Sequence, residues 1–363
     1  MKIIIDAREA VRNPTGIGNV GRKFVDFIVE RYKGNDEYFI FPNPEKWNKE
    51  KKKKGFKLFN FIFHIFWKQI YIPFKAFVLK ADVILSFAPE SYFLTTKPII
   101  ITVYDMIFFK LPVNQIGIWG MYWKYIVPVS IRKATKIIAI SEATKRDVVE
   151  IVGINNSKIR VLYLGVDNVL INTSLGKNLS EIPYFLFVGH PEPRRGIEYL
   201  IEAFDLFLKK NPAYKLIIVG KDNEYRNNLI KKVRSLGIEE KVFFTGFISS
   251  EKLSSLYLHA EAFIYPSLYE GFGLTILEAM AHGCPVITTN ISSLPEVAND
   301  AAITILPSNV EDLLNAMLNI RNDPSLRSKM VAKGYENIKR FRWEFFETGV
   351  LQIINEFKLM LQR

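Results

Sequence analysis

Two glutamates flank a glycine turn in the second half of the 363-residue chain. Glu270 and Glu278 are eight positions apart in the stretch "SLYEGFGLTILEAMAHGCPVITT", with Gly271 and Gly273 between them. The stretch is typical of a strand exit, a loop and a helix, followed by a further strand. The loop therefore precedes a helix amino end, where unpaired backbone N–H groups and the helix dipole favour a phosphate or a sugar hydroxyl. Glycines let such a ligand approach the backbone closely.

The two glutamates differ in the alternatives that they leave open. Thr275 and Glu278 fit a capping box, in which Glu278 would accept a hydrogen bond from the N–H of the capping residue. From the sequence, Glu278 can equally well be a helix-capping residue or a residue that contacts a ligand. No local cap or turn requires a carboxylate at Glu270, so we expect its carboxylate to point into a ligand site.

Cationic loops follow two other predicted strands of this half. Arg194 and Arg195 come after the strand "YFLFVG", and Lys221 comes after "KLIIVG". Guanidinium groups can clamp a diphosphate through paired hydrogen bonds, although two arginines can equally be solvated surface residues. Ligands of doubly wound sheets bind at the carboxyl ends of the strands. Together with the glycine turn, these loops indicate an anionic, nucleotide-type ligand.

The first half carries a literal Gly-x-Gly-x-x-Gly pattern, "GIGNVG", from Gly16 to Gly21. In a dinucleotide-binding fingerprint this pattern follows its strand at once, and an acidic residue stands about twenty positions further on. Here "AREAVRNPT" intervenes, and Asp36 and Glu37 precede the second strand instead of ending it. We interpret the segment as a glycine loop that faces the ligand from the first half. A hydride-transfer enzyme ranks third among the alternatives.

Short apolar runs alternate with amphipathic stretches along the whole chain. They predict the strands "KIIID", "YFIF", "DVILSF", "IIITVYD" and "KIIAIS" in the first half and "YFLFVG", "KLIIVG", "KVFFTG", "AFIYPS" and "PVITT" in the second. Nearly continuous apolar strands with helices between them indicate parallel sheets that are covered on both faces. The fold class is therefore α/β, with two doubly wound domains.

A polar stretch without periodicity, residues 166–183, separates the two halves. It predicts an N-terminal domain at residues 1–170 and a second domain at residues 171–342. The final segment, residues 343–363, is predicted to be one amphipathic helix. Its apolar positions are Phe345, Phe346, Val350, Ile353, Ile354, Phe357 and Leu361.

The amino-acid composition of the chain limits which classes of molecule it can bind. Hydrophobic residues make up 49% of the chain, which excludes a disordered protein, and the net charge of +12 suggests an anionic partner. The single cysteine, Cys284, excludes an internal disulfide and a cysteine-based zinc site, and we expect a buried structural thiol. No Asp-x-Asp occurs, and no metal-ligand spacing relates His64, His190, His259 and His282. We therefore expect neither a metal nor another cofactor.

Residues 49–80 combine the lysine run Lys51–Lys54 with many aromatic residues. Such a segment can lie on an anionic membrane, or it can form core helices on the first sheet after a solvated lysine loop. Its aromatics occur on too many faces for a clean interfacial stripe. No apolar run suits a signal peptide or approaches the ~18 residues of a membrane span, so we expect a cytoplasmic protein, with peripheral contact at the inner membrane face as an option. The basic residues form no recognisable nucleic-acid module.

The motifs together resemble the retaining glycosyltransferases of glycosyltransferase family 4, the group 1 glycosyltransferases, and among them the mannosyltransferase-like branch. The resemblance rests on "DAREAVRNPTGIG", "ITVYDMIFFKLP", "KIIAISEATKRDVVE", "KIRVLYLGVD", "YFLFVGHPEPRRGIEYLIEAF", "SLYEGFGLTILEAMAHGCPVIT", "SSLPEVANDAA" and "FRWE". It implies the GT-B fold, in which two Rossmann-like domains face a cleft. The second domain would hold the nucleotide sugar, the first would contact the acceptor, and the C-terminal helix would cross back to the first domain.

The resemblance also implies roles for individual residues. Glu270 is expected to face the hydroxyls of the donor sugar and Glu278 the nucleotide ribose. Arg195 and its neighbour Arg194 would hold the diphosphate. The other expected donor-binding residues are Gly16 and Gly18 in the first domain and Gly189, His190, Lys221, Gly271, Phe272, Gly273, Leu274 and Thr275 in the second. The expected catalytic residues are Glu270, Arg195, Tyr104 and Asp105.

The family mechanism transfers a sugar with retention and without a metal. Arginines and helix dipoles stabilise the departing diphosphate, a phosphate oxygen takes the acceptor's proton, and the glutamates position the sugar without attacking it. The chain departs from the family pattern at Tyr104, where many members have histidine. It also has Arg194-Arg195 in place of Arg-Lys, and His190 in place of a common arginine.

We therefore expect a glycosyltransferase that moves a hexose from a nucleoside-diphosphate sugar to a growing glycan or a lipid-linked acceptor. GDP-mannose is favoured as the donor, and UDP-glucose comes next. The alternative from another class is a catalytically silent homologue that binds a nucleotide sugar and acts as a partner or scaffold. Tyr104 and His190 motivate this alternative, and the intact Glu270, Glu278 and Arg195 oppose it.

Overall fold

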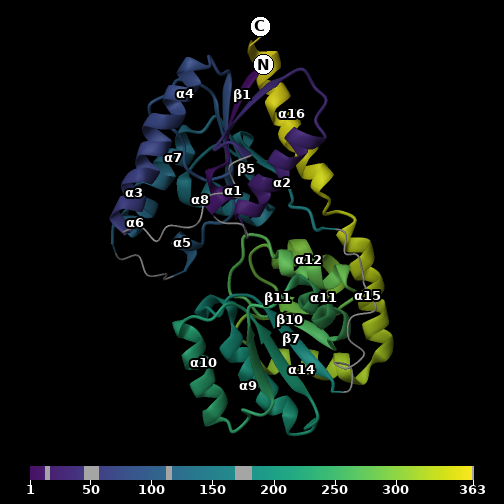
Figure 1. The fold of residues 1–363 in the computed structure, drawn as a ribbon. Coiled ribbons are helices and arrows are strands. Elements are labelled where there is room, and N and C mark those ends of the chain that lie inside the picture. Colours follow the sequence, from purple (N-terminus) through teal and green to yellow (C-terminus); the bar gives the residue numbers. More distant parts are fainter. Residues whose placement is uncertain (13–16, 45–56, 112–116, 168–181, 362–363) are drawn as a thin grey trace. The chain divides into compact units, whose positions relative to one another are not determined.

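The computed structural model describes residues 1–12, 17–44, 57–111, 117–167 and 182–361. The chain forms two compact units (Figure 1): unit 1 is Met1–Gly165 with Trp343–Arg363, and unit 2 is Val166–Arg342. The expected domain boundary at residue 170 lies outside the described residues, as do Gly16 and the lysine run Lys51–Lys54.

Unit 1 is built on a parallel sheet of six strands in the order β2-β1-β3-β4-β5-β6. The strands are β1 (Lys2–Asp6), β2 (Glu37–Phe41), β3 (Val83–Ser86), β4 (Ile99–Val103), β5 (Lys136–Ala139) and β6 (Ile159–Val161). Both β3 and β4 are buried along their whole length. Such strands are apolar throughout because helices cover both faces of the sheet.

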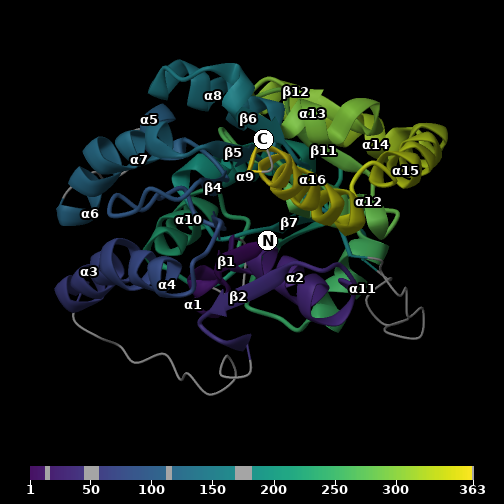
Figure 2. The same cartoon turned by 90° about the horizontal axis from the view of Figure 1, so that it is seen from above.

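The helices of unit 1 form a layer on each face of this sheet (Figure 2). One layer comprises α3 (Lys57–Phe66), the π-helical turn η2 (Trp67–Tyr71), α4 (Ile72–Val78), α6 (Ile118–Met121), the π-helical turn η3 (Tyr122–Ile126), α7 (Val127–Lys133) and α8 (Glu142–Val152). The other layer comprises α2 (Ile17–Glu30) and α16 (Trp343–Leu361), which contact each other. The short elements α1 (Arg8–Arg12), α5 (Ile107–Lys110) and η4 (Asn156–Lys158) complete the unit.

Unit 2 repeats this design with the strand order β12-β11-β10-β7-β8-β9. Its strands are β7 (Tyr184–Val188), β8 (Lys215–Val219), β9 (Val242–Gly246), β10 (Ala262–Tyr265), β11 (Val286–Thr289) and β12 (Ala302–Ile305). Its helices are η6 (Pro193–Arg195), α9 (Ile197–Leu208), α10 (Glu224–Ser235), α11 (Ser250–His259), α12 (Leu274–Ala281), α13 (Leu294–Ala298), η7 (Asn299–Ala301), α14 (Val310–Asn322) and α15 (Pro324–Ile338).

The two predicted doubly wound sheets are confirmed, and each contains one strand that the sequence pattern missed. The missed strands are β6 and β12, which lie at the edges of their sheets. Both are short and partly exposed. A strand that is both short and partly exposed gives a weak signal in the sequence, whereas the predicted edge strands β2 and β9 have five residues each.

Each sheet has one switch point, where the strand order reverses. It lies between β1 and β3 in unit 1 and between β7 and β10 in unit 2. Chain segments that leave two such neighbouring strands diverge, and ligands of open α/β sheets bind in the resulting crevice at the carboxyl ends. In unit 2 the fold therefore brings the arginine loop after β7 beside the glycine turn after β10.

The C-terminal helix α16 is part of unit 1. Its buried positions are Phe346, Val350, Ile353, Ile354 and Phe357. Glu356 on its outer side forms an ion pair with Arg160 at 2.7 Å. Phe345 was expected on the buried side, but it is 53% exposed. One residue turns a helix by about 100°, so Phe345 and Phe346 cannot both face the same neighbours. The side chain of Leu361 lies outside the described part of the chain.

A buried ion pair lies at the carboxyl end of β1. Lys68, on η2, places Nζ 2.9 Å from Oδ2 of Asp6, and the Tyr92 hydroxyl donates to the same oxygen at 2.6 Å. Trp67 Nε1 donates to Oδ1 at 2.9 Å. Burial alone would raise the pKa of Asp6, but the charge of Lys68 and the hydrogen bonds outweigh it, so the pKa lies below its ordinary value.

Lys68→Met should destabilise unit 1 by about 3–5 kcal/mol, because the Asp6 carboxylate would remain buried without its charge partner. The pKa of Asp6 is lowered, so its contribution is present above the ordinary carboxyl pKa and is lost as the pH falls through the folded-state pKa. The difference between wild type and variant should therefore shrink in acid. Urea unfolding at several pH values measures it. Adding Asp6→Asn should restore most of the loss, and an equally unstable double variant would contradict this account.

Candidate active site

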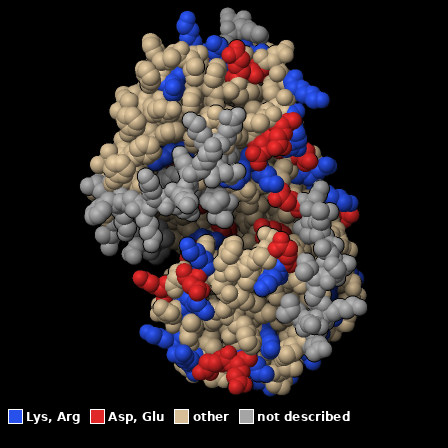
Figure 3. Space-filling model, viewed as in Figure 1, with Lys and Arg blue, Asp and Glu red and all other residues tan. Residues whose placement is uncertain are grey.

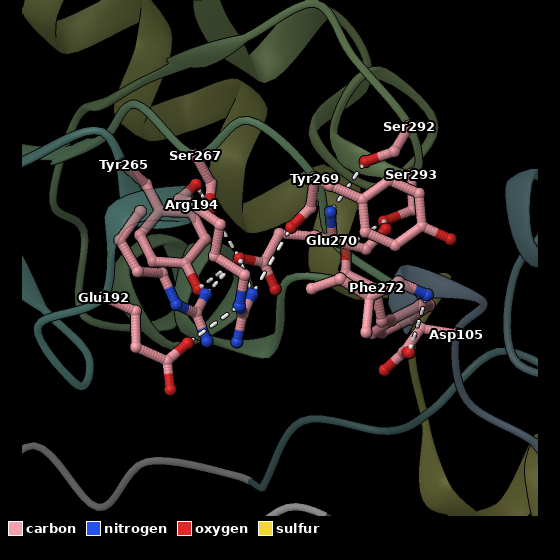
Figure 4. A network of polar contacts seen from close by, with 12 residues as sticks. Asp105, Glu192, Arg194, Tyr265, Ser267, Tyr269, Glu270, Phe272, Ser292 and Ser293 are labelled. Carbon is pink, nitrogen blue, oxygen red and sulfur yellow. Dashed lines mark hydrogen bonds and ion pairs between the residues drawn. The ribbon is translucent and has the colours of Figure 1, made fainter. Parts of the chain in front are cut away.

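The candidate site of unit 2 is centred on Glu270, in the loop after β10 (Figure 4). Its Oε1 atom accepts hydrogen bonds from the Ser267 hydroxyl at 2.6 Å and from the Tyr265 hydroxyl at 3.2 Å. The same oxygen is 3.1 Å from Nη1 of Arg194 and forms a second ion pair with Nη1 of Arg195. The side chain of Glu270 is only 10% exposed. Unit 2 therefore neutralises this buried carboxylate with its own groups.

These contacts give Glu270 a structural reason for its carboxylate that does not come from its local sequence. Its two arginine partners lie on η6, about 75 positions earlier in the chain, and a local sequence pattern cannot reveal them. The Leu268 N–H also donates to the carbonyl oxygen of Arg194 at 2.7 Å. Side chain and backbone contacts thus join the arginine loop to the glycine turn across the switch point.

Two serines hold the backbone of the glycine turn. Ser292 Oγ accepts a hydrogen bond from the N–H of Glu270 at 2.9 Å. Ser293 Oγ lies 2.9 Å from the carbonyl oxygens of both Glu270 and Phe272 (Figure 4). Gly273 then adopts φ +107°, and a Cβ there would lie 3.0 Å from a leucine side chain of α13. The positive φ therefore favours glycine at this position, and the space for a side chain is tight.

Helix α12 begins directly after Gly273, and no side chain caps it. This excludes the capping box, one of the two alternatives left open for Glu278, because Thr275 is the second residue of the helix and not its cap. The Thr275 Oγ1 atom is buried and has no hydrogen-bond partner within the described ranges. The first N–H groups of an uncapped helix, together with the positive end of its dipole, favour an anion.

Glu278 lies one turn further along α12 and faces Tyr257 of α11. The Tyr257 hydroxyl donates to Oε2 of Glu278 at 3.3 Å. Burial raises the pKa of Glu278, the hydrogen bond from Tyr257 opposes this rise, and the carboxylate of Asp167 adds to it. A further hydroxyl donor would stabilise the buried carboxylate, and a ribose hydroxyl has this chemistry.

The other expected donor-binding residues lie around the same sheet edge. Gly189 and His190 follow β7, and Lys221 follows β8. The Gly189 N–H donates to the carbonyl oxygen of Val219 at 2.8 Å, while His190 and Lys221 are exposed. Arg195 has its guanidinium 5.2 Å from the centre of the Tyr265 ring, and its Nε is buried without a hydrogen-bond partner in the described part of the chain.

Unit 1 has a hollow of about 240 Å³ at its own switch point. Loops after β3 and β4 and the helical segments α1, α3, α6 and η3 supply its lining, which consists of Glu9, His64, Ala88, Pro89, Glu90, Tyr104, Asp105, Trp119 and Trp123. Aromatic rings offer apolar contact to the C–H faces of a sugar, and carboxylates accept hydrogen bonds from its hydroxyls. The hollow therefore suits a hydroxyl-rich ligand.

The structure brings two predicted residues, Tyr104 and Asp105, to this hollow. The Tyr104 side chain is buried, its hydroxyl donates to the Phe87 carbonyl at 3.4 Å, and burial raises its pKa well above the ordinary value. Asp105 Oδ1 accepts from the Ile107 N–H at 3.1 Å. Gly18, expected in a loop, is instead buried in the first turn of α2, which begins at Ile17.

Sequence reasoning missed Trp119 and Trp123. The available signal was their spacing of four positions, which places two indole rings on one side of a helix that follows the Tyr104-Asp105 pair. This spacing also occurs in ordinary core helices, so it does not identify a site by itself.

A chain of buried polar groups lies beneath the hollow. Arg8 Nη1 is 3.1 Å from Nδ1 of His64, and Nε2 of His64 is 3.6 Å from Oε1 of Glu90. Arginine can only donate, so Nδ1 accepts and the ring proton lies on Nε2, on the side of Glu90. Burial raises the pKa of Glu90, although the charge of Lys68 opposes this rise.

Within the described residues, the structure also bears on metal binding, membrane crossing and thiol chemistry. These residues contain no group of three or more His, Cys, Asp or Glu side chains that could hold a metal ion. None of the helices found there has the length and apolar character needed to cross a membrane. Cys284 is buried, and burial raises the pKa of its thiol to about 12, so it is protonated at neutral pH and is no nucleophile.

Glu278→Gln should raise the Tm of unit 2 at mildly alkaline pH and change it little in acid. Because the folded-state pKa of Glu278 is raised, the protonated carboxyl contributes stability that is lost as the pH rises through that pKa. Glutamine keeps an acceptor for Tyr257 and carries no charge. Thermal unfolding of both proteins at the two pH values measures the effect. An equal Tm change at both would show that ionisation of Glu278 is not the cause.

Two family models match the chain. Residues 25–169 match the model described as Glycosyltransferase Family 4, and residues 175–337 match the model described as Glycosyl transferases group 1. The O-antigen chain mannosyltransferase B of Escherichia coli is 31% identical over 241 residues, which are 64% of this chain and 62% of that protein. The chain thus covers less than two thirds of the length of this relative.

The chain is also similar to a second mannosyltransferase and to two solved structures. The O-antigen chain mannosyltransferase RfbU of Salmonella typhimurium is 30% identical over 244 residues, 66% of this chain and 67% of that protein. Sucrose-phosphate synthase from Thermosynechococcus elongatus has a TM-score of 0.76 at 18% identity and covers 99% of this chain and 100% of its own. Anabaena HepE, solved with UDP and glucose, has a TM-score of 0.72 at 16% identity and covers 98% and 99%.

Two six-stranded parallel sheets, each with one switch point, match the architecture of these structures along nearly the whole chain. The family models together match most of both units. The chain therefore has the GT-B fold and belongs to the group 1 glycosyltransferases of glycosyltransferase family 4.

Proposed function

We propose that the protein is a retaining, metal-independent glycosyltransferase that moves a hexose from a nucleoside-diphosphate sugar to a glycan or a lipid-linked acceptor in the cytoplasm. One observation carries this proposal. Arg194 and Arg195 converge on Glu270 at the switch point of unit 2, beside the uncapped start of α12. Cations, helix N–H groups and an acidic acceptor of hydroxyl protons are the groups that a sugar diphosphate requires.

The diphosphate would form ion pairs with the two guanidinium groups in place of Glu270. In this proposal, the phosphate oxygens pair with Arg194 and Arg195 and with the first N–H groups of α12. The Nε of Arg195 and the Oγ1 of Thr275, buried and without a hydrogen-bond partner within the described ranges, would then gain acceptors. Fixed donors of this kind stabilise the negative charge that develops on a departing diphosphate.

Glu270 would remain oriented after the arginines turn to the phosphates. Its Oε1 keeps the hydrogen bonds from Ser267 and Tyr265, and its backbone keeps those to Ser292 and Ser293. A carboxylate that has lost its cationic partners accepts strongly from sugar hydroxyls. Glu270 thus positions the donor sugar, and Glu278, which faces Tyr257, would do the same for the ribose.

The reaction itself needs no side chain as a nucleophile. The bond between C1 of the sugar and the diphosphate oxygen breaks, and a bond from the acceptor oxygen to C1 forms on the same face. The acceptor's proton passes to an oxygen of the leaving diphosphate. Arg194 and Arg195 supply the positive charge that a metal ion supplies in other enzymes.

The relatives favour GDP-mannose as the donor, because both curated relatives described above are named mannosyltransferases. UDP-glucose comes next, because HepE was solved with UDP and glucose. For the acceptor, we propose that one of its sugar rings occupies the hollow of unit 1. Trp119 and Trp123 would contact the ring, and Glu9 and Asp105 would accept from its hydroxyls.

A catalytically silent nucleotide-sugar-binding protein is the second candidate. It is favoured by one observation: the hydroxyl of Tyr104, which replaces the usual histidine, donates to a backbone carbonyl within unit 1. The two candidates differ in what happens to a bound donor. A transferase should slowly release GDP and free mannose from GDP-mannose, with water as the acceptor, whereas a silent protein should leave the donor intact.

GDP-mannose or UDP-glucose should raise the Tm of the wild type, and Glu270→Ala should lose the part of the shift that depends on the sugar. A ligand at 100 times its dissociation constant adds about 2.7 kcal/mol of stability. Thermal shifts with GDP, UDP, ADP and their hexose conjugates identify the base and the sugar. Glu202→Ala on α9, where Glu202 pairs with Lys232, is the matched control and should behave like the wild type. The donor-site assignment fails if no nucleotide shifts the Tm.

Trp123→Ala should weaken acceptor binding and leave donor binding unchanged. In the presence of the donor, methyl α-mannoside at high concentration serves as a simple acceptor, and product formation gives the KM for each substrate. We expect the acceptor KM to rise about tenfold or more, because a buried aromatic contact is worth about 1.5–3 kcal/mol. Trp343→Phe, on α16, is the control. If only the donor KM changes, the hollow is not part of the acceptor site.

A further inference from the structure

The outer side of one helix layer of unit 1 is apolar. Of the 23 large hydrophobic side chains that are exposed within the described residues, fourteen lie between residues 59 and 129. Scattered exposed hydrophobics are normal in soluble proteins, but a concentration of this kind marks an interaction surface. We name this surface the aromatic face. It comprises the exposed sides of α3, η2, α4, α6, η3 and α7 with the loop residue Leu94.

The continuous helical run α3–η2–α4 is apolar on two opposite sides. Its exposed residues recur at intervals of three or four and include Phe59, Phe63, Phe66, Ile70, Phe74 and Phe77. The residues at positions 64, 68, 72 and 76 are buried against the rest of unit 1. In the sequence alone, the aromatics occupy too many faces for an interfacial stripe. The reason is that core-facing and outward-facing aromatics alternate along the same helices. The structure separates them into a core side and an outward stripe.

The second helical run extends this surface. Met121, Tyr125 and Val129 are exposed on α6, η3 and α7. Phe61 of α3 packs against Trp119 and Tyr122 with ring centroids 4.9 and 5.7 Å apart, so the two runs lie side by side. In Figure 3, the surface over α3 and α4 carries few charged side chains.

The segments that carry the aromatic face contain cations and no anions. Residues 57–80, 91–98 and 117–135 contain neither aspartate nor glutamate, and they hold seven lysines and arginines besides Lys68, which is buried and paired with Asp6. Two copies of this chain would bring like charges together across the face, which opposes a dimer of the symmetric kind. An apolar surface whose own segments carry cations and no acidic residues is instead complementary to an anionic lipid bilayer.

A hollow at the edge of the face has the chemistry of a lipid head-group site. It has a volume of about 440 Å³, and its lining includes Phe77, Leu94, Thr95, Thr96, Lys97 and Lys133. Lys133 Nζ donates one hydrogen bond, to the Phe93 carbonyl at 3.2 Å. An ammonium group has three donors, so Lys133 retains capacity for a phosphate oxygen. The threonine hydroxyls add further donors beside two apolar side chains.

We propose that the aromatic face docks on an anionic membrane. Phe74 and Phe77 enter the boundary between head groups and acyl chains, and Lys97 and Lys133 bind the phosphate of an anionic phospholipid. This contact goes beyond the proposed transferase reaction and does not depend on the donor or the acceptor. It gives a membrane role to the helices of residues 57–80, whereas the lysine run Lys51–Lys54 lies outside the described residues and carries no part of the argument.

Vesicle co-sedimentation of the full chain tests the proposal. Wild type should bind vesicles of phosphatidylglycerol in phosphatidylcholine and should not bind phosphatidylcholine alone, and added salt should weaken the binding. Phe74→Ser with Phe77→Ser should lower the partition coefficient by about tenfold or more. Lys97→Gln and Lys133→Gln should lower it by roughly fivefold each. Phe247→Ser, at an 86% exposed position of unit 2, is the matched control and should bind like the wild type.

Three outcomes would overturn the proposal: no binding of wild type to phosphatidylglycerol vesicles, equal binding to both vesicle types, or wild-type binding by the double phenylalanine variant. Sedimentation velocity tests the alternative partner. If the wild type is a dimer and the double phenylalanine variant is a monomer, the face binds a second copy of the chain instead. Phe74 and Phe77 are 59% and 80% exposed, so their substitution removes no core packing. Tm shifts with GDP and UDP test the donor site in the same variants, which separates failure of this inference from failure of the proposed function.

Discussion

The carboxylate of Glu270 is the group on which the candidate site of unit 2 depends. One oxygen receives two guanidinium groups and two hydroxyls, and it lies between loops that leave neighbouring strands. A buried carboxylate without such partners would be costly, so the arginine loop and the glycine turn form one unit. In the proposed function, a diphosphate would not need a new cationic site. It would replace Glu270 as the partner of the two arginines, and Glu270 would stay held by Ser267 and Tyr265.

The two switch points share a topology but carry opposite chemistry. In unit 2, Arg194, Arg195 and the uncapped start of α12 present positive charge and N–H donors. In unit 1, the hollow is lined by carboxylates and indole rings. Since fold topology fixes only where a ligand binds, the side chains decide which ligand it is. The contrast supports the proposal that unit 2 binds the anionic part of the donor and unit 1 a neutral, hydroxyl-rich group.

Local patterns in the sequence predicted the parts of the fold that depend on local physics. The central strands were evident because they are buried on both sides, and the glycine turn was evident because Gly273 needs a positive φ. The edge strands β6 and β12 lacked this signal. The sequence could not decide whether Thr275 caps a helix, because a glycine N-cap leaves no side-chain pattern. The partners of Glu270 come from another strand, so their position depends on the tertiary fold.

The aromatic run of residues 57–80 shows how one sequence pattern can serve two surfaces. A helix that only covers a sheet needs one apolar side, and its outer side is usually polar. Here the buried side already holds the core contacts and the Asp6–Lys68 ion pair, so the more exposed Phe59, Phe74 and Phe77 contribute little to the packing of unit 1. Exposed aromatic side chains reduce solubility unless another surface covers them. Their regular spacing and the absence of acidic residues among them therefore indicate a partner that is itself apolar and anionic.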